Sequence, residues 1–87
     1  MPLSFPNAAR SYDRRKQCVS FWAHDSTLEI TFDVEAEALH AICHDDQRTE
    51  ESLLETFDNN RARIEQLASR AYARHRAAYL RLTTKDF

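Results

Sequence analysis

The stretch 49–78 reads TEESLLETFDNNRARIEQLASRAYARHRAA, and it predicts the element on which the rest of the fold depends. Its apolar residues recur at helical spacing and fall within one stripe roughly 100° wide. The stripe consists of Leu53, Phe57, Ile64, Leu67, Ala68 and Ala71. Thr49 is a suitable N-cap, and Asn59-Asn60, a pair of weak helix formers, leaves room for a kink or short break. We therefore predict one long helix over about 49–78 that needs a surface to pack on.

The chain before this helix alternates between apolar and polar residues, as a strand does. The alternation covers residues 17–24 and again residues 27–32. It predicts a hairpin over about 17–33 that turns at His24-Asp25-Ser26. Because the sequence contains no glycine, a type I turn with an added residue is expected in place of a glycine-dependent primed turn.

The remaining segments complete an α+β fold. Asp33 is expected to cap a short helix over about 34–44, and Leu3–Phe5 to form a short extended piece followed by a connector. Tyr79–Thr84 alternates and is expected to return as a strand, with a helix continuing to Leu82 as the competing interpretation. The prediction is a small antiparallel sheet, made of the hairpin and short N-terminal and C-terminal strands, packed on the short and the long helix.

Length and composition suit one soluble globular domain spanning residues 1–87. No apolar run approaches the roughly 18 residues of a membrane span, and the first residues lack the apolar region of a signal peptide. We expect a cytoplasmic protein without a membrane partner. Cys18 and Cys43 are the two cysteines, and they suit free, reduced thiols better than a disulfide framework.

Several separated motifs resemble one known family. They are Leu3-Ser4-Phe5-Pro6-Asn7, the strand pattern Val19-x-Phe21-Trp22, the helix pattern Phe57…Asn60-Arg61…Ile64…Ala68…Tyr72, and the ending Leu82-Thr83-x-x-Asp86-Phe87. In their order and spacing they resemble a small bacterial family catalogued as domain of unknown function 1488. The resemblance implies a small α+β fold and favours the final strand. It implies no reaction, cofactor or catalytic residue.

Charge is strongly segregated along the chain. Residues 1–24 sum to +3, residues 25–58 to −10 and residues 59–87 to +5. The basic ends are expected either to fold against the acidic middle or to form a basic face for an acidic partner. Arg63, Arg70 and Arg74 fall on one line of the predicted long helix, and Arg81 is expected to extend it. Such a row predicts nucleic-acid binding as the alternative function.

Two kinds of chemistry receive weak support. His40, Cys43 and His44 stand one helical turn apart and are competent metal ligands, but paired cysteines or matched distant ligands are missing. A core role for Cys43 and a helix-dipole role for the histidines explain them more simply. The sequence also lacks a nucleophile elbow and a phosphate-binding glycine loop. We expect no cofactor and no enzymatic activity.

Trp22 alternates away from the predicted core face, which leaves an indole on the other face of the sheet. Aromatic residues are enriched in protein interfaces. We therefore predict a non-catalytic module that binds an unknown protein or assembles with itself. The expected assembly is a homodimer in which Trp22 and Tyr79 form part of the interface.

Overall fold

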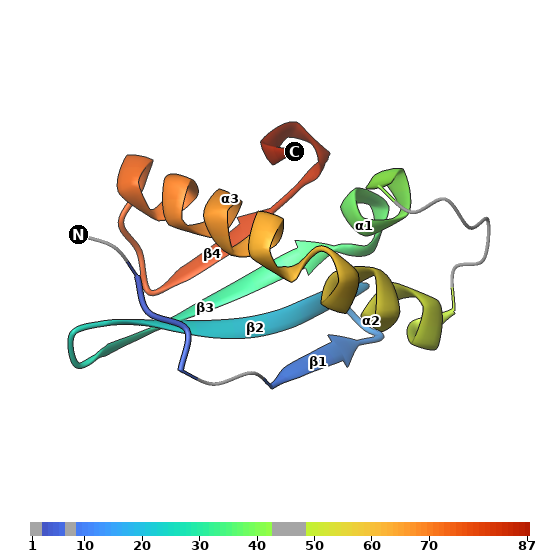
Figure 1. Ribbon diagram of the computed structural model, residues 1–87, viewed down its shortest axis with the longest axis horizontal. Coiled ribbons are helices and arrows are strands. Elements are labelled where there is room, and N and C mark those ends of the chain that lie inside the picture. The colour runs from blue at the N-terminus through green and yellow to red at the C-terminus, as the bar shows by residue number, and fades with distance from the viewer. Residues whose placement is uncertain (1–2, 7–8, 43–48) are drawn as a thin grey trace.

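The computed structural model describes residues 3–6, 9–42 and 49–87, and Figure 1 shows a sheet whose helices all lie on one side. The elements in chain order are β1 (Arg10–Asp13), β2 (Cys18–Asp25), β3 (Leu28–Glu35), α1 (Ala36–Ile42), α2 (Glu50–Asn59), α3 (Arg61–Arg74), β4 (Tyr79–Leu82) and the 3₁₀ turn η1 (Thr84–Asp86). This arrangement confirms the α+β prediction. Within the described residues, no helix is long and apolar enough to cross a membrane.

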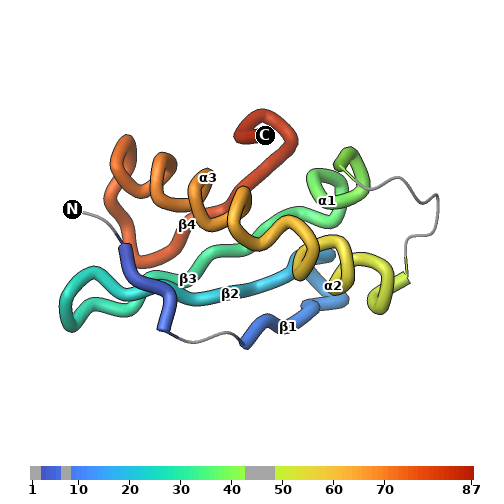
Figure 2. Tube along the Cα trace, in the orientation of Figure 1, coloured from blue at the N-terminus to red at the C-terminus, as the bar shows by residue number. Residues whose placement is uncertain are grey.

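The sheet is mixed, and its strand order is β1-β2-β3-β4. The first three strands are antiparallel neighbours, whereas β4 runs parallel to β3 with Tyr79 opposite Thr31. The prediction of a wholly antiparallel sheet is therefore wrong for the last strand, although the strand itself is confirmed. Figure 2 shows the reason, because α2 and α3 carry the chain back along the sheet before β4 begins.

The N-terminal strand lies later in the chain than predicted. Leu3–Phe5 contributes a single bridge, in which the Ser4 N–H donates to the His24 carbonyl at 3.0 Å and the reverse bond measures 2.8 Å. The regular strand is β1, which the sequence reading placed in a connector. Its residue Tyr12 pairs with Val19 and packs against the core. Polar composition concealed this strand, because only one of its side chains is apolar enough to mark the core face.

The hairpin between β2 and β3 is confirmed, but its turn differs from the prediction. Asp25 pairs with Leu28, which leaves a loop of two residues, Ser26 and Thr27. Ser26 adopts φ 59°, a left-handed conformation that favours glycine. The register of the two strands therefore determines a short loop even though the sequence offers no glycine for it.

Asp33 does not cap a helix. Strand β3 continues to Glu35, and its residue Val34 is fully buried opposite Val19. The apolar alternation that begins at Ile30 thus extends through Val34 and overrides the capping preference of Asp33. The short helix α1 begins at Ala36, and the last residues of the predicted helix, His44 among them, lie outside the described residues.

The predicted long helix is divided in two at Asn60. Thr49 caps α2 as expected, with its hydroxyl accepting from the Ser52 N–H at 3.1 Å. The Asn60 amide Nδ2 donates to the Thr56 carbonyl at 2.9 Å, and this bond satisfies the side chain where α2 ends. The second helix, α3, ends at Arg74, so the prediction of continuous helix to residue 78 is wrong.

The core lies between the helices and the facing side of the sheet. Phe21 stands at its centre, 5.2 Å from the Phe32 ring and 5.2 Å from the Phe57 ring between centroids. Ile64 and Ala68 of α3 are fully buried in the same cluster. Most of the predicted apolar stripe therefore faces the sheet, although two helices share it. Leu67 is outside this cluster and lines a hollow between α3 and the turn after β4.

Candidate interaction site on the uncovered face of the sheet

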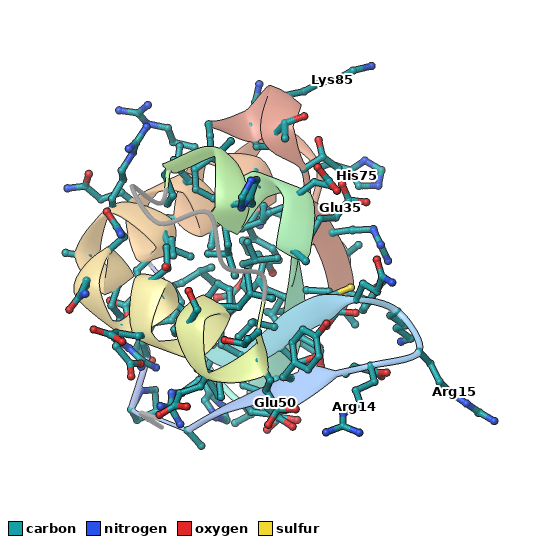
Figure 3. The ribbon with its side chains drawn as sticks, turned by 90° about the vertical axis from the view of Figure 1, so that its right-hand side faces the viewer. Arg14, Arg15, Glu35, Glu50, His75 and Lys85 are labelled. Atoms are coloured by element: carbon teal, nitrogen blue, oxygen red, sulfur yellow. The ribbon has the colours of Figure 1, made fainter. Side chains whose placement is uncertain are left out.

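The face of the sheet turned away from the helices carries the residues of interest. Side chains alternate along each strand, so the observed register assigns them to this face. We define the open face by the residues Ser11, Asp13, Cys18, Ser20, Trp22, His24, Glu29, Thr31, Asp33, Glu35, Tyr79 and Arg81. Figure 3 shows the sheet nearly edge on, with Glu35 pointing away from the helices on this side.

The two aromatic residues predicted for the interface lie in one transverse row. Trp22 of β2 pairs with Thr31 of β3, and Thr31 pairs with Tyr79 of β4. Two strand spacings therefore separate the aromatic residues, a distance of roughly 10 Å between their backbones. Trp22 is half-buried and Tyr79 is 45% exposed. The structure thus brings the two predicted residues onto the same surface.

A buried carboxylate lies beside this row. Asp33 is 1% exposed although it belongs to the open face. The Ser20 hydroxyl donates to its Oδ1 at 2.5 Å, and the Tyr79 hydroxyl donates to its Oδ2 at 2.6 Å. The Lys16 ammonium lies 3.7 Å from the same Oδ2. Asp33 therefore links β2, β3 and β4 to the turn after β1, and it fixes the orientation of Tyr79.

Lys16 contacts this carboxylate, and Arg81 is the cross-strand neighbour of Asp33 on β4. The Lys16 ammonium lies 5.4 Å from the centre of the Tyr79 ring, a distance suited to a cation–π contact. Arg81 donates through Nε to Glu35 at 2.7 Å and through its terminal nitrogen to the Lys16 carbonyl at 3.4 Å. Positive and negative groups thus alternate across the open face, and most already have partners within the chain.

The Tyr79 phenol and the Cys18 thiol of this cluster have raised pKa values. The hydrogen bond to Asp33 raises the pKa of Tyr79, and burial adds to the effect. Burial likewise raises the pKa of the Cys18 thiol, whose Sγ donates to the Lys16 carbonyl at 3.1 Å. A thiol or phenol of this kind serves as a hydrogen-bond donor at neutral pH and not as an activated nucleophile.

Three of the four arginines that were predicted to form a row lie together on α3. Arg63, Arg70 and Arg74 are exposed on α3, where Arg63 lies 5.8 Å from the Phe87 ring. Arg81, which was expected to extend the row, lies on the open face and pairs with Glu35. This part of the prediction is wrong, because the chain leaves the helix at Arg74 and returns as a strand on the sheet.

The predicted metal ligands cannot be assembled from the described residues. His40 lies on α1, whereas Cys43 and His44 fall outside the described residues. The His40 Nδ1 is buried, and no hydrogen-bond partner for it stands among the described residues. Within those residues, no group of three or more histidine, cysteine, aspartate or glutamate side chains is placed to hold a metal ion.

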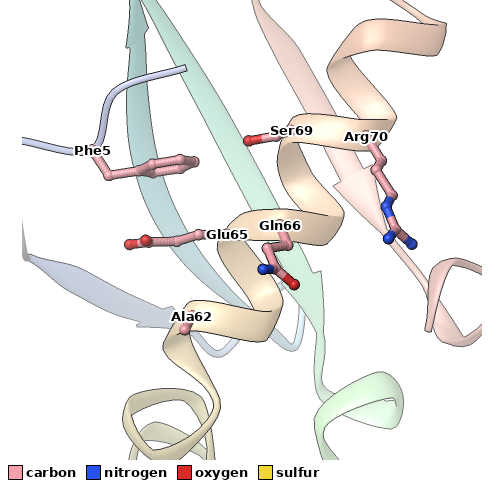
Figure 4. Close-up of a pocket in the computed structure, with 6 residues that line it drawn as sticks. All are labelled: Phe5, Ala62, Glu65, Gln66, Ser69 and Arg70. Carbon is pink, nitrogen blue, oxygen red and sulfur yellow. The ribbon is translucent and has the colours of Figure 1, made fainter. Parts of the chain in front are cut away.

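A shallow hollow lies on the opposite, helical side of the molecule. Its lining residues are Phe5, Ala62, Glu65, Gln66, Ser69 and Arg70. Figure 4 shows Phe5 on the same side of α3 as Glu65, whereas the Arg70 side chain points away from the Phe5 ring. Glu65 already accepts from Arg61 at 3.2 Å. The lining side chains therefore do not converge on a common point.

Sequence reasoning missed the central member of the open-face cluster. The sequence pattern assigned Asp33 to a helix cap, and it indicated no functional role for Ser20 or Lys16. The available signal was the alternation of β3, which continues past Phe32 to Val34 and so places Asp33 on the same face as Thr31. The partners of Asp33 come from three separate segments, and only the strand register brings them together.

The chain is similar to known proteins both in sequence and in fold. A family model described as protein of unknown function, DUF1488, matches residues 3–82. The crystal structure of a protein of unknown function from the DUF1488 family of Shewanella loihica PV-4 is similar to this chain, with a TM-score of 0.80 at 15% sequence identity. The match covers 93% of this chain and 91% of that one, and it shows a shared fold. No curated protein matches the chain.

Proposed function

The chain belongs to the DUF1488 family of proteins of unknown function, and for this member we propose a non-catalytic binding module that assembles with a second copy of itself. The open face of the sheet would form the contact. The observation that carries the proposal is the transverse row of Trp22, Thr31 and Tyr79 on a face that no described helix covers. The family resemblance noted in the sequence is confirmed, while the family itself supplies no activity.

The chemistry of the open face supports self-association. Tyr79 is one of two large hydrophobic residues that are exposed among the described residues, and the other, Leu28, lies at the hairpin tip and alternates toward the helix side. An aromatic residue can bury a large area while its polar atom keeps its hydrogen bond. Tyr79 can therefore be buried in an interface without losing a hydrogen bond, because its hydroxyl already donates to Asp33.

The charges of the open face are compatible with a two-fold dimer. Arg81 of the face and Lys16 of the adjoining turn supply positive charge, and Glu29 and Glu35 supply negative charge. In a two-fold interface the same patch meets its own copy, so a patch with both signs can place each charge near its opposite. The Asp33 cluster holds Tyr79 in one orientation before association, which lowers the entropy lost on binding.

The test compares two substitutions by sedimentation equilibrium. Trp22→Ser should weaken dimerisation by at least about tenfold in Kd, which corresponds to about 1.4 kcal/mol. Leu28→Ser is the matched control, because it removes an exposed hydrophobic side chain of the hairpin that is not on the open face. A wild-type monomer at about 200 µM, well above the Kd expected for a specific dimer, would refute the proposal. A dimer weakened by Leu28→Ser alone would refute it as well.

Nucleic-acid binding is the second candidate, and the exposure of Arg63, Arg70 and Arg74 on α3 is the observation that favours it. Phosphate contacts made by such residues give an affinity that falls steeply with salt. Binding of a mixed oligonucleotide pool at low salt, lost when the three arginines are replaced by glutamate, would support this function. Absence of wild-type binding at low salt would exclude it.

A further inference from the structure

The outer edge of β4 carries backbone groups that the sheet does not use. The Thr31 N–H donates to the Ala78 carbonyl at 2.9 Å, so Ala78, Leu80 and Leu82 direct their backbone groups toward β3. Backbone groups alternate in direction along a strand, and therefore Tyr79 and Arg81 direct theirs to the opposite side. Since β4 is the last strand in the sheet order, no strand of the described residues pairs with that side.

This free edge has a defined end. The Thr83 N–H donates to the Asp86 side chain at 2.8 Å, and the Thr83 carbonyl accepts from the Asp86 N–H at 3.0 Å. The next outward-pointing residue, Thr83, therefore uses its N–H and its carbonyl within the capping box of η1. Two residues, Tyr79 and Arg81, remain with an N–H and a carbonyl each. Together they can exchange hydrogen bonds with a short extended segment laid along the edge.

A basic hollow lies between α3 and the turn that follows β4, on the helix side of the sheet. Its lining residues are Leu67, Arg70, Ala73, Arg74, Lys85 and Asp86, contributed by α3 and by the turn that follows β4. Leu67 and Ala73 supply an apolar surface, and the three basic residues supply positive charge. The single carboxylate, Asp86, is already engaged by Thr83 and lies 3.9 Å from Arg74.

The other side of the edge carries basic residues that already have acidic partners. Arg81 lies on the open face next to Lys16, and the nearby Glu35 already accepts from Arg81. An extended segment along β4 would therefore meet balanced charge on the open face, where Arg81 pairs with Glu35 and Lys16 with Asp33, and net positive charge from α3 and η1 on the helix side. The helix side favours acidic side chains on the incoming segment.

We propose that the free edge of β4 binds an extended acidic segment of a partner protein as an added strand. A second copy of the chain suits this edge less well, because its own β4 carries no acidic side chain to meet the basic residues of α3 and η1. The site uses the backbone of Tyr79 and Arg81, whereas the proposed dimer uses side chains of the open face. The two contacts are therefore separable by substitution.

The test uses a fluorescein-labelled heptapeptide of alternating valine and glutamate, followed by fluorescence anisotropy at low salt. Arg81→Pro removes an outward N–H that no ladder bond uses, and a proline is tolerated at such a position of an edge strand. Arg81→Ala is the matched control, because it removes the same side chain and keeps the N–H. We expect Arg81→Pro to weaken binding at least about tenfold relative to Arg81→Ala.

Hydrogen exchange of the wild-type protein supplies a readout that does not depend on a folded variant. The peptide should slow exchange at the Tyr79 and Arg81 amides, and the matching valine–lysine peptide should not. Absence of binding at about 1 mM acidic peptide would overturn the proposal, because a Kd above this concentration is too weak for a specific site. Equal affinities of the two Arg81 variants for the peptide would overturn it too. So would an oligonucleotide that displaces the peptide by binding to α3 and does not slow hydrogen exchange in β4. Trp22→Ser should leave peptide binding unchanged, which separates failure of this site from failure of the dimer.

Discussion

Replacement of Asp33 by alanine tests whether this buried carboxylate holds the sheet together. Asp33 accepts hydrogen bonds from Ser20 and Tyr79 and lies near the Lys16 ammonium, so the substitution removes one acceptor from three strand or turn segments. We expect the variant to remain folded at low temperature but to be clearly less stable. We also expect β4 to lose more protection from hydrogen exchange than β2.

The magnitude follows from the environment of each partner. A hydrogen bond to a charged group contributes about 1.5–3 kcal/mol, with the lower part of this range expected for Tyr79 because its side chain is 45% exposed. Ser20 adds a similar contribution, and Lys16 adds little because its side chain is 54% exposed. Asp33→Ala should therefore reduce the free energy of unfolding by about 2–4 kcal/mol.

Urea denaturation of a double-mutant cycle is the decisive measurement. The cycle combines Asp33→Ala with Tyr79→Phe, a substitution that removes only the hydroxyl. A coupling energy of about 1–2 kcal/mol is expected between these contacting residues. Coupling below about 0.3 kcal/mol, the usual error of additivity, would mean that the 2.6 Å contact does not stabilise β4 and that the reasoning is wrong.

Three other predictions concern the rest of the molecule. Phe57→Ala should lower the free energy of unfolding by about 3–5 kcal/mol, because the ring is fully buried against Phe21, and urea denaturation measures the change. Stability should fall as the pH rises above about 10, since the pKa values of Tyr72 and Tyr79 are raised in the folded state and their stabilisation, fully present below the ordinary value, is lost as the pH rises through the raised value. Urea midpoints by circular dichroism across this range should show a smaller loss in the Tyr72→Phe, Tyr79→Phe double variant. Ser26→Gly should stabilise the protein by about 0.5–1 kcal/mol in thermal unfolding, because φ 59° suits glycine better than serine, whereas Thr27→Gly should not.

Local patterns in the sequence predicted the elements better than their pairing. Strict alternation identified β2 and β3, and the apolar stripe identified the helix residues that are buried, Phe57 and Ile64 among them. The break at Asn60 was foreseen only as an option, because helix propensity is a weak signal that packing and side-chain hydrogen bonds can override. The Asn60 amide bond to Thr56 is a contact of that kind.

The parts that sequence reasoning misjudged depend on long-range contacts. Whether β4 lies parallel or antiparallel to β3 is decided by the path of the intervening helices, and nothing in residues 79–84 alone records it. Asp33 has the residue type of a helix cap. Its neighbour Val34 pairs with Val19 on the adjacent strand, and this pairing keeps Asp33 within β3. Trp22 and Tyr79 were predicted to lie in one interface, and the observed register places both on the open face.

The parallel pairing of β3 with β4 has a consequence for how the chain folds. Strands β1 to β3 are neighbours in sequence and can form early, but β4 closes a loop that contains about half of the chain. Until that loop closes, β3 presents an unpaired edge next to a carboxylate that lacks the Tyr79 donor. Such an edge can pair with another unfolded chain, so refolding should compete with aggregation as concentration rises. The yield of refolded protein should therefore fall with concentration more steeply than the stability of the native state would suggest.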